Sequence, residues 1–214
     1  MVFRLYVYDH CPFCVRARMP FGLKNIPFDL RFQLNDDEET PIRMIGKKML
    51  PILEGEDGFM GESLDIVRKI DGISGPALFS GEPDQALVGW MRQWGTTINS
   101  LVIPRTPYPV FAEFRTQEAR AYFTRKKEEI FGNFDDLLSK TDTLLASAEA
   151  GLKALEPLLP AQNSVSIDDI MLFPLLRSLS ILPDIKLPDS VRDYQVGMAE
   201  RSGVPLVRDL RASV

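Results

Sequence analysis

The sequence predicts an α/β domain followed by an all-α domain, and three observations support this fold class. The first 72 residues alternate between strand-like and helix-like segments, in the order β-α-β-α-β-β-α. Residues 73–84 are rich in glycine, proline and serine, which is the composition of a linker. Residues 85–214 show helical periodicity and no convincing strand. We therefore predict two domains, at residues 1–72 and 85–214, joined by that linker.

The first half of the α/β domain is predicted to be a strand, a helix and a second strand. Residues 2–8 alternate apolar and polar side chains, as a strand does. Because proline fits the first helical position, a helix is expected over residues 12–24. Pro20 would remove a hydrogen bond inside it, so we expect a kink or an early end near Met19. Residues 27–34 alternate again with one polar face, which predicts an edge strand.

The second half of this domain is predicted to contain a short helix, a hairpin and a closing helix. Thr40 is the expected cap of the short helix, which Gly46 ends. A proline-containing strand follows at residues 50–53, and the turn-like residues 55–58 lead into its hairpin partner. The closing helix is expected to begin near Ser63, from which apolar residues recur at helical spacing.

The second domain is predicted to be made of helices. They are expected at residues 84–103, 116–131, 133–156, from 166 onward, and 188–201. Ser166 and Asp169 form a start that resembles a capping box, before a segment that is apolar nearly all round and hence buried. Trp90 and Trp94 are one turn apart, which favours helix packing at the domain interface over a substrate wall. Residues 125–129 are charged, which favours a solvated helix face over a partner site.

Composition and charge narrow the class of protein. The chain has 214 residues, of which 45% are hydrophobic and 26% charged, as in ordinary globular proteins. Its net charge of −5 argues against a nucleic-acid partner. No apolar run approaches the ~18 residues of a membrane helix, and no secretory signal is visible. We therefore expect a cytoplasmic protein with no nucleic-acid or membrane partner.

Both cysteines and the only histidine of the chain lie together, as His10, Cys11 and Cys14, where the first strand meets the first helix. Two cysteines are too few for a disulfide framework, and a Cys-x-x-Cys pair in the cytoplasm is usually catalytic or metal-binding. A structural zinc ion takes four ligands, whereas these residues supply three at most. Redox chemistry is therefore favoured and no metal is predicted. For His10 we favour a structural or tuning role over proton transfer.

The two cysteines are expected to have different roles. Cys11 falls at about the N-cap of the helix, where free N–H groups and the helix dipole stabilise a thiolate. Cys14 lies one turn later and is more shielded. This predicts that Cys11 attacks and Cys14 resolves the resulting disulfide. Arg16 and Arg18 add positive potential to the same helix, and Phe13 is placed to shape the rim of the site.

Two further pairs of residues are candidates for substrate binding. The Leu50–Pro51 bond is a candidate for a cis peptide, although a base rate of about 5–6% favours trans. Ser63 begins a helix, where a hydroxyl and free N–H groups bind a carboxylate, and Glu62 beside it suits an ammonium group. Taken alone, Ser63 is better explained as a simple helix cap.

Taken together, these features resemble the bacterial two-domain glutaredoxins of the glutaredoxin-2 type, whose architecture is that of glutathione transferases. The resemblance is carried by residues 9–14, 17–19, 21–27, 34–37, 51–53, 62–63 and 169–177. Residues 104–160 carry less of it. It implies a thioredoxin-like N-terminal domain joined to an all-helical C-terminal domain. It also implies that Ser166 and Asp169 are a folding element rather than a site.

The resemblance also implies the roles of individual residues. Cys11 and Cys14 match the active-site pair, and Pro51 matches a cis-proline, against the base rate. Leu50 would then offer its backbone N–H and C=O to the cysteinyl part of glutathione, as an added strand would. The expected glutathione-binding residues are Leu50, Pro51, Glu62, Ser63 and Phe13, of which Glu62 and Ser63 match the pair that holds the γ-glutamyl end.

Two details of the glutathione site depart from the family's pattern or stay open. Phe13 stands where the family often has tyrosine, which removes a hydroxyl and predicts tuning rather than loss of activity. The cation that would bind the glycine carboxylate is not identified, and Arg43, Lys47 and Lys48 are the candidates.

We therefore expect a glutathione-dependent dithiol oxidoreductase that reduces protein disulfides and glutathione mixed disulfides. Glutathione is its co-substrate, disulfide-containing or glutathionylated proteins are its partners, and the large second domain favours a monomer. The alternatives are a glutathione transferase, which usually has Tyr or Ser at this turn, and a non-enzymatic glutathione-binding or iron–sulfur module, which would borrow ligands from a second chain or from glutathione. A periplasmic disulfide oxidant is disfavoured by the missing signal.

Overall fold

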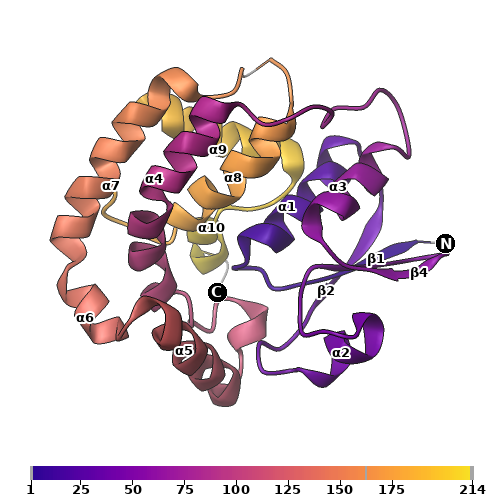
Figure 1. Cartoon of the computed structure of the whole chain (residues 1–214), viewed down its shortest axis with the longest axis horizontal. Helices are drawn as coiled ribbons and strands as arrows, with labels where there is room; N and C mark the ends of the chain where they lie inside the picture. Colours follow the sequence, from indigo (N-terminus) through magenta and orange to yellow (C-terminus); the bar gives the residue numbers. More distant parts are fainter. Residues whose placement is uncertain (1, 162, 213–214) are drawn as a thin grey trace.

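The computed structural model describes residues 2–161 and 163–212. A mixed four-stranded sheet with three helices forms the N-terminal domain, and helices form the rest of the chain (Figure 1). Residues 72–84 connect the two parts and form no helix or strand. The predicted fold class, an α/β domain followed by an all-α domain, is confirmed.

The sheet has the strand order β2-β1-β3-β4. Strand β1 (Phe3–Val7) pairs in parallel with β2 (Phe28–Phe32) and antiparallel with β3 (Ile52–Gly55), which pairs antiparallel with β4 (Gly58–Met60). β2 lies at the edge of the sheet, as its polar face predicts. Because β1 is an inner strand, the cysteine motif that follows it emerges near the middle of the sheet.

Three helices flank the sheet: α1 (Pro12–Leu23), α2 (Glu39–Ile45) and α3 (Ser63–Asp71). Figure 1 shows α1 and α3 together on one side of the sheet and α2 on the other. The expected early end near Met19 is wrong, because α1 continues through Pro20 to Leu23. Met19, Pro20 and Phe21 are all buried, so packing compensates for the hydrogen bond that proline cannot make.

The start of α2 also differs from the prediction. Its N-cap is Glu38, and Thr40 lies inside the first turn of the helix. The carboxylate of Asp37 accepts a hydrogen bond from the backbone N–H of Thr40 at 3.0 Å. Asp37 therefore satisfies an N–H group of the first helical turn, which was the role expected of the Thr40 hydroxyl. Gly46 ends the helix as predicted, with a φ of 76° that favours glycine.

The C-terminal domain contains seven α-helices among the described residues. They are α4 (Gln85–Val102), α5 (Gln117–Phe131), α6 (Phe134–Ser139), α7 (Thr141–Leu155), α8 (Ile167–Leu179), α9 (Asp189–Ser202) and α10 (Val207–Ala212). The helix predicted over 133–156 is divided at Lys140, because the hydroxyls of Ser139 and Thr141 donate to Asp136 O and Leu138 O at the junction. Helix α10 lies beyond the last predicted helix.

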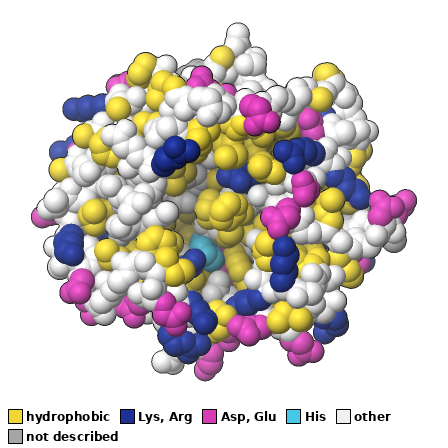
Figure 2. Space-filling model, in the orientation of Figure 1, with side chains coloured by type: hydrophobic (Ala, Val, Ile, Leu, Met, Phe, Trp, Pro, Cys, Tyr) yellow, Lys and Arg dark blue, Asp and Glu magenta, His cyan; other side chains and the backbone are white. Residues whose placement is uncertain are grey.

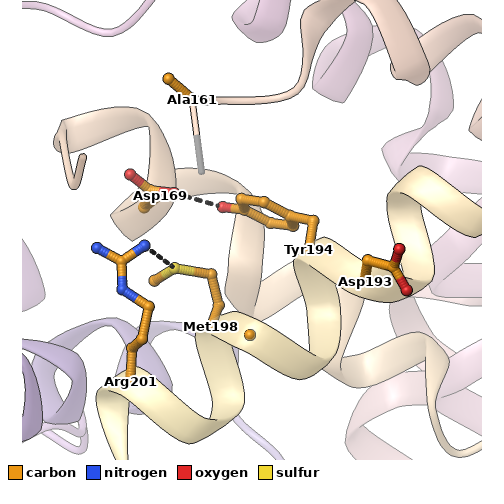
Figure 3. Close-up of a pocket in the computed structure, with 7 residues that line it drawn as sticks. Ala161, Asp169, Asp193, Tyr194, Met198 and Arg201 are labelled. Atoms are coloured by element: carbon orange, nitrogen blue, oxygen red, sulfur yellow. Dashed lines mark hydrogen bonds between the residues drawn. The ribbon is translucent and has the colours of Figure 1, made fainter. Parts of the chain in front are cut away.

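Helix α8 begins with the predicted capping box. The Ser166 hydroxyl accepts the N–H of Asp168 at 3.2 Å, and the Asp169 carboxylate accepts the N–H of Ser166 at 2.8 Å. The hydroxyl of Tyr194, in α9, donates to the other carboxylate oxygen of Asp169 at 2.9 Å beside a small cavity (Figure 3). The capping box therefore also joins α8 to α9, which supports its expected role in folding.

The two tryptophans of α4 pack against α7. The indole N–H of Trp90 donates to Gly151 O at 2.7 Å. A Cβ added at Gly151 would lie 2.5 Å from the ring of Trp94. The prediction of helix packing is confirmed, because both contacts join α4 to α7.

One hydrophobic cluster spans the two domains, and a second cluster lies within the N-terminal domain. Val15 and Met19 of α1 and Val67 of α3 belong to the same buried cluster as the side chains of the helical domain. At the same interface, a Cβ added at Gly22 would lie 1.9 Å from the carbonyl oxygen of Ser202. Helix α1, which carries the cysteine pair, is therefore fixed directly against the helical domain. None of the helices in residues 2–161 and 163–212 combines the length and the hydropathy that a membrane span requires.

Replacing Gly22 with alanine is expected to lower the free energy of unfolding by about 3 kcal/mol, because the new methyl group overlaps backbone that cannot move freely. Urea denaturation measures this loss. The matched control is Gly197→Ala in α9, where an added Cβ meets no atom within 4 Å. The control should be neutral or gain up to about 1 kcal/mol from helix propensity. Equal stabilities for the two variants would contradict the close packing of α1 on α9.

Candidate active site

The cysteine pair lies at the start of α1, where both residues occupy their predicted positions. Cys11 is the N-cap of the helix, with extended backbone angles (φ −76°, ψ 121°), and Pro12 is the first helical residue. Cys14 is fully buried, whereas Cys11 is partly exposed, and both are free thiols. The thiol at the helix start is thus the accessible one.

The surroundings of the two thiols shift their pKa values in opposite directions. The pKa of Cys11 is lowered to about 6, mainly by a hydrogen bond from the Cys14 thiol and further by His10 and by the backbone N–H groups of Cys14 and Phe13, against the effect of burial. The pKa of Cys14 is raised, mainly by burial and then by its bond to Cys11. The backbone N–H of Tyr8 also donates to Cys14 Sγ at 3.4 Å. Near neutral pH the site thus holds one thiolate beside one protonated thiol.

The rate of alkylation at Cys11 should rise with pH and reach half its maximum near pH 6, because only the thiolate reacts and the pKa of Cys11 is lowered to about 6. Stopped-flow alkylation across pH 4–9 measures the midpoint. Replacing Cys14 with alanine removes the largest stabilising contact, so the midpoint should move up toward the ordinary cysteine value of about 8.5. A midpoint near that value in the unaltered protein would contradict the proposed role of the Cys14 thiol.

His10 is held by a carboxylate from the helical domain. Glu113 Oε1 accepts the backbone N–H of His10 at 2.9 Å and lies 2.7 Å from His10 Nδ1. Glu113 is fully buried, and the His10 ring stacks on Tyr8 at 5.8 Å and meets the rings of Phe114 and Phe123. This packing supports the structural role that the sequence favours. Sequence reasoning missed Glu113, which lies 103 positions away.

Asp9, the residue before His10, is held by two arginines. The Asp9 carboxylate accepts from Arg18 of α1 at 2.5 Å and from Arg177 of α8 at 2.9 Å. Arg177 is almost fully buried and also donates to the backbone oxygens of Asp9 and Pro205, both at 2.7 Å. Burial lowers the pKa of Arg177 to about 10, and Asp9 opposes this shift. Arg18 of α1 therefore shares the Asp9 carboxylate with Arg177 of the helical domain.

The Leu50–Pro51 peptide bond is cis, as the resemblance implies and against the base-rate expectation. Pro51 is buried, and Leu50 and Cys11 line the same cleft. The cleft has a volume of about 310 Å³ and is lined by Tyr8, His10, Cys11, Asn35, Lys48, Met49, Leu50, Tyr122, Phe123, Lys126 and Lys127. Figure 2 shows the histidine side chain at the floor of a hollow with basic side chains nearby.

One wall of this cleft comes from α5, which sequence reasoning missed. Tyr122 donates its hydroxyl to Glu38, and the Nζ atom of Lys48 lies 3.7 Å from the centre of the Tyr122 ring. These contacts fix α5 against the N-terminal domain. Lys126 and Lys127 are accessible to solvent, as predicted for residues 125–129, and they also line the cleft.

The remaining predicted residues lie outside the lining of the cleft. Glu62 is the N-cap of α3, with a φ of 63°, and its carboxylate pairs with Lys47 at 2.9 Å. Ser63 is buried and is the first residue of the helix, so it is not the cap. Phe13 is 54% exposed, and the guanidinium of Arg16 lies 5.2 Å from the centre of its ring. Phe13 is therefore an outer feature of the site.

The cleft offers no metal centre among the residues that the structure describes. Within residues 2–161 and 163–212, no group of three or more His, Cys, Asp and Glu side chains is placed to hold a metal ion. The groups that can react are the two thiols of Cys11 and Cys14.

Comparisons with known proteins agree across the whole chain. The family described as "Glutaredoxin 2, C terminal domain" matches residues 86–210, and "Glutathione S-transferase, N-terminal domain" matches residues 5–77. Glutaredoxin 2 of Escherichia coli (strain K12) is 45% identical over 212 residues, which cover 97% of this chain and 99% of the relative. Its counterpart in Escherichia coli O157:H7 matches equally well.

Solved structures extend the comparison to three dimensions. Glutaredoxin 2 from Salmonella typhimurium, crystallised in complex with glutathione, matches with a TM-score of 0.93 and 43% identity over 98% of both chains. Glutathione transferase GSTFuA3 from Phanerochaete chrysosporium has a TM-score of 0.63 at 16% identity, with 100% of this chain and 98% of that one covered, and shares the fold alone. The chain therefore belongs to the glutaredoxin 2 family of glutathione-dependent oxidoreductases.

Proposed function

We propose that Cys11 is the attacking thiol and Cys14 the resolving thiol of this glutaredoxin. The observation that carries the proposal is the asymmetry of the pair: Cys11 is partly exposed and has a lowered pKa, whereas Cys14 is buried and has a raised pKa. A thiolate attacks a disulfide, and a protonated thiol does not. The accessible thiolate therefore reacts first.

Both expected reactions follow from this assignment. With a glutathionylated protein, Cys11 attacks the glutathione sulfur and the protein thiolate leaves; a second glutathione then attacks the mixed disulfide and releases oxidised glutathione and the Cys11 thiolate. With a protein disulfide, the Cys11 thiolate first attacks one protein sulfur, and the other protein sulfur leaves as a thiolate. Cys14 then attacks Cys11, its proton passes to the leaving thiolate, and two glutathione molecules reduce the resulting Cys11–Cys14 disulfide.

Glutathione is proposed to bind along the backbone of Leu50. Leu50 lines the cleft together with Cys11, where an extended peptide can pair with its N–H and C=O groups. Glu62 and Ser63, at the start of α3, would bind the γ-glutamyl end. The glutathione complex of the Salmonella relative supports glutathione as the co-substrate here.

Lys48 is the proposed partner of the glycine carboxylate. Of the three candidate cations, only Lys48 lines the cleft with Cys11. Arg43 is exposed and faces Glu39 at 3.5 Å, and Lys47 pairs with Glu62 at 2.9 Å. The Nζ atom of Lys48 donates to Asn35 O at 2.7 Å, which holds it at the cleft wall.

The proposal extends to partners and setting. Disulfide-containing and glutathionylated proteins are the proposed substrates, because the accessible Cys11 lies in an open cleft. The protein is proposed to act as a monomer in the cytoplasm, where glutathione keeps thiols reduced.

Replacing Cys14 with serine is expected to retain deglutathionylation and to lose most reduction of protein disulfides. The first reaction needs only Cys11 and a second glutathione, whereas the second needs an internal attack by Cys14. Two assays measure the separation: release of glutathione from a glutathionylated peptide, and reduction of a protein with one accessible disulfide. Equal losses in both assays would contradict the assignment of Cys14 as the resolving thiol.

A further inference from the structure

The cleft beside Cys11 is basic although the protein is acidic. The chain has a net charge of −5. Among the described residues that line the cleft, Lys48, Lys126 and Lys127 carry positive charge and none is an aspartate or glutamate. Two of these lysines come from α5, in the helical domain. Such a local reversal of charge favours an anionic partner at this wall.

The ammonium groups of Lys126 and Lys127 have no salt-bridge or hydrogen-bonding partner among the described residues. Neither forms a hydrogen bond or a salt bridge with any residue in 2–161 or 163–212, and Lys127 Nζ lies over the ring of Phe123, 5.7 Å from its centre. Glu38, the carboxylate whose charge Lys126 affects, already accepts from Tyr122 and lies 3.8 Å from Lys48. The two ammonium groups are thus available to a ligand.

The position of these lysines is nevertheless fixed relative to Cys11. Tyr122, one turn before Lys126 on α5, is bonded to Glu38 and covered by Lys48, and Phe123 packs on His10, the neighbour of Cys11. Glutathione is proposed to lie along Leu50, at another part of the same lining. A mixed disulfide has its two halves on either side of the sulfur pair, so the protein half would extend away from Leu50 and past Lys126 and Lys127 of α5.

We propose that α5 forms a subsite for an acidic segment of the protein substrate, which Lys126 and Lys127 contact while the disulfide of that substrate meets Cys11. This inference rests on the proposed function and deepens it by naming the substrate class. Because both lysines are solvent-accessible at the rim, their attraction extends over about one Debye length, roughly 10 Å at 0.1 M salt. It therefore selects among partners by charge and does not require a single sequence motif.

The test uses two glutathionylated peptides that differ only near the cysteine, where one has two aspartates and the other two asparagines. The ratio of their kcat/KM values is measured for the unaltered protein and for Lys126→Gln, Lys127→Gln and the double variant. We expect the unaltered protein to prefer the acidic peptide. Each substitution should lower the ratio about two- to fivefold, the usual range for exposed ion pairs, and 0.5 M salt should lower it as well.

Lys153→Gln, on the exposed surface of α7, is the matched control and should leave the ratio unchanged.

Two results would overturn the subsite. A ratio that stays unchanged in the double variant would show that the lysines do not select the peptide. Equal decreases in kcat/KM for both peptides would indicate that the lysines contact the glutathione half of the substrate. The mixed disulfide of glutathione with 2-mercaptoethanol, which has no protein half, tests the proposed function separately. If the unaltered protein turns over this compound, an unchanged ratio counts against the subsite alone; if it does not, the proposed function fails.

Discussion

Replacing Cys11 with serine is expected to reduce both deglutathionylation and protein-disulfide reduction by about a thousandfold or more. A serine hydroxyl is not ionised near neutral pH and cannot form a disulfide, whereas the pKa of Cys11 is lowered to about 6. Serine is also a favourable N-cap, so α1 should still form. Glutathione turnover coupled to glutathione reductase measures the loss.

The control for this variant is Cys14→Ser, which makes the same chemical change one turn further along α1. It should keep deglutathionylation while the Cys11 variant loses it. Circular dichroism should show equal helix content in the two proteins. If the Cys11 variant kept more than a tenth of either activity, another group would have to be the nucleophile.

Replacing Arg177 with methionine is expected to lower the free energy of unfolding by about 3–5 kcal/mol, the usual cost of leaving a buried charge with too few partners. Arg177 is almost fully buried and binds the Asp9 carboxylate at 2.9 Å. The variant leaves Asp9 with Arg18 alone and also leaves the carbonyl oxygens of Asp9 and Pro205 without their donor. Urea denaturation measures the loss.

An exposed ion pair provides the matched control. Arg192 binds Asp189 at 2.7 Å on the surface of α9. Arg192→Met should therefore lower the free energy of unfolding by less than about 1 kcal/mol. Adding Asp9→Asn to Arg177→Met removes the stranded charge and should restore part of the stability. If the Arg177 and Arg192 variants lost similar amounts of free energy of unfolding, or if the double variant regained none, the result would contradict a stabilising role of the Arg177–Asp9 pair between the domains.

Much of the fold and the centre of the site follow from local sequence patterns. Alternation identifies β1 and β2, and helical spacing identifies α4, because each pattern reports the face that a segment buries. The capping-box start before an apolar segment identifies α8. The position of Cys11 at the N-cap follows from a cysteine placed before a proline at a strand end. These features depend on neighbours in the chain, so the sequence alone can reveal them.

Long-range contacts could not be predicted in the same way. Arg177 reaches Asp9 across 168 positions and Glu113 reaches His10 across 103, and no local pattern connects them. Pro20 misled the prediction because the packing of α1 in the core outweighs the lost hydrogen bond. Lys126 and Lys127 look like an ordinary charged helix face until α5 is placed beside Cys11. What was missed is therefore mainly what the helical domain contributes to the site.

The most direct test of the central claim is to trap the glutathione adduct of the first step. The Cys14→Ser variant is reacted with oxidised glutathione and examined by intact-mass and peptide mass spectrometry. We predict one glutathione per chain, bonded to Cys11 and released by reduced glutathione. Absence of an adduct on Cys11, with an adduct forming instead on Cys14 in the Cys11→Ser variant, would contradict the assignment of Cys11 as the attacking thiol.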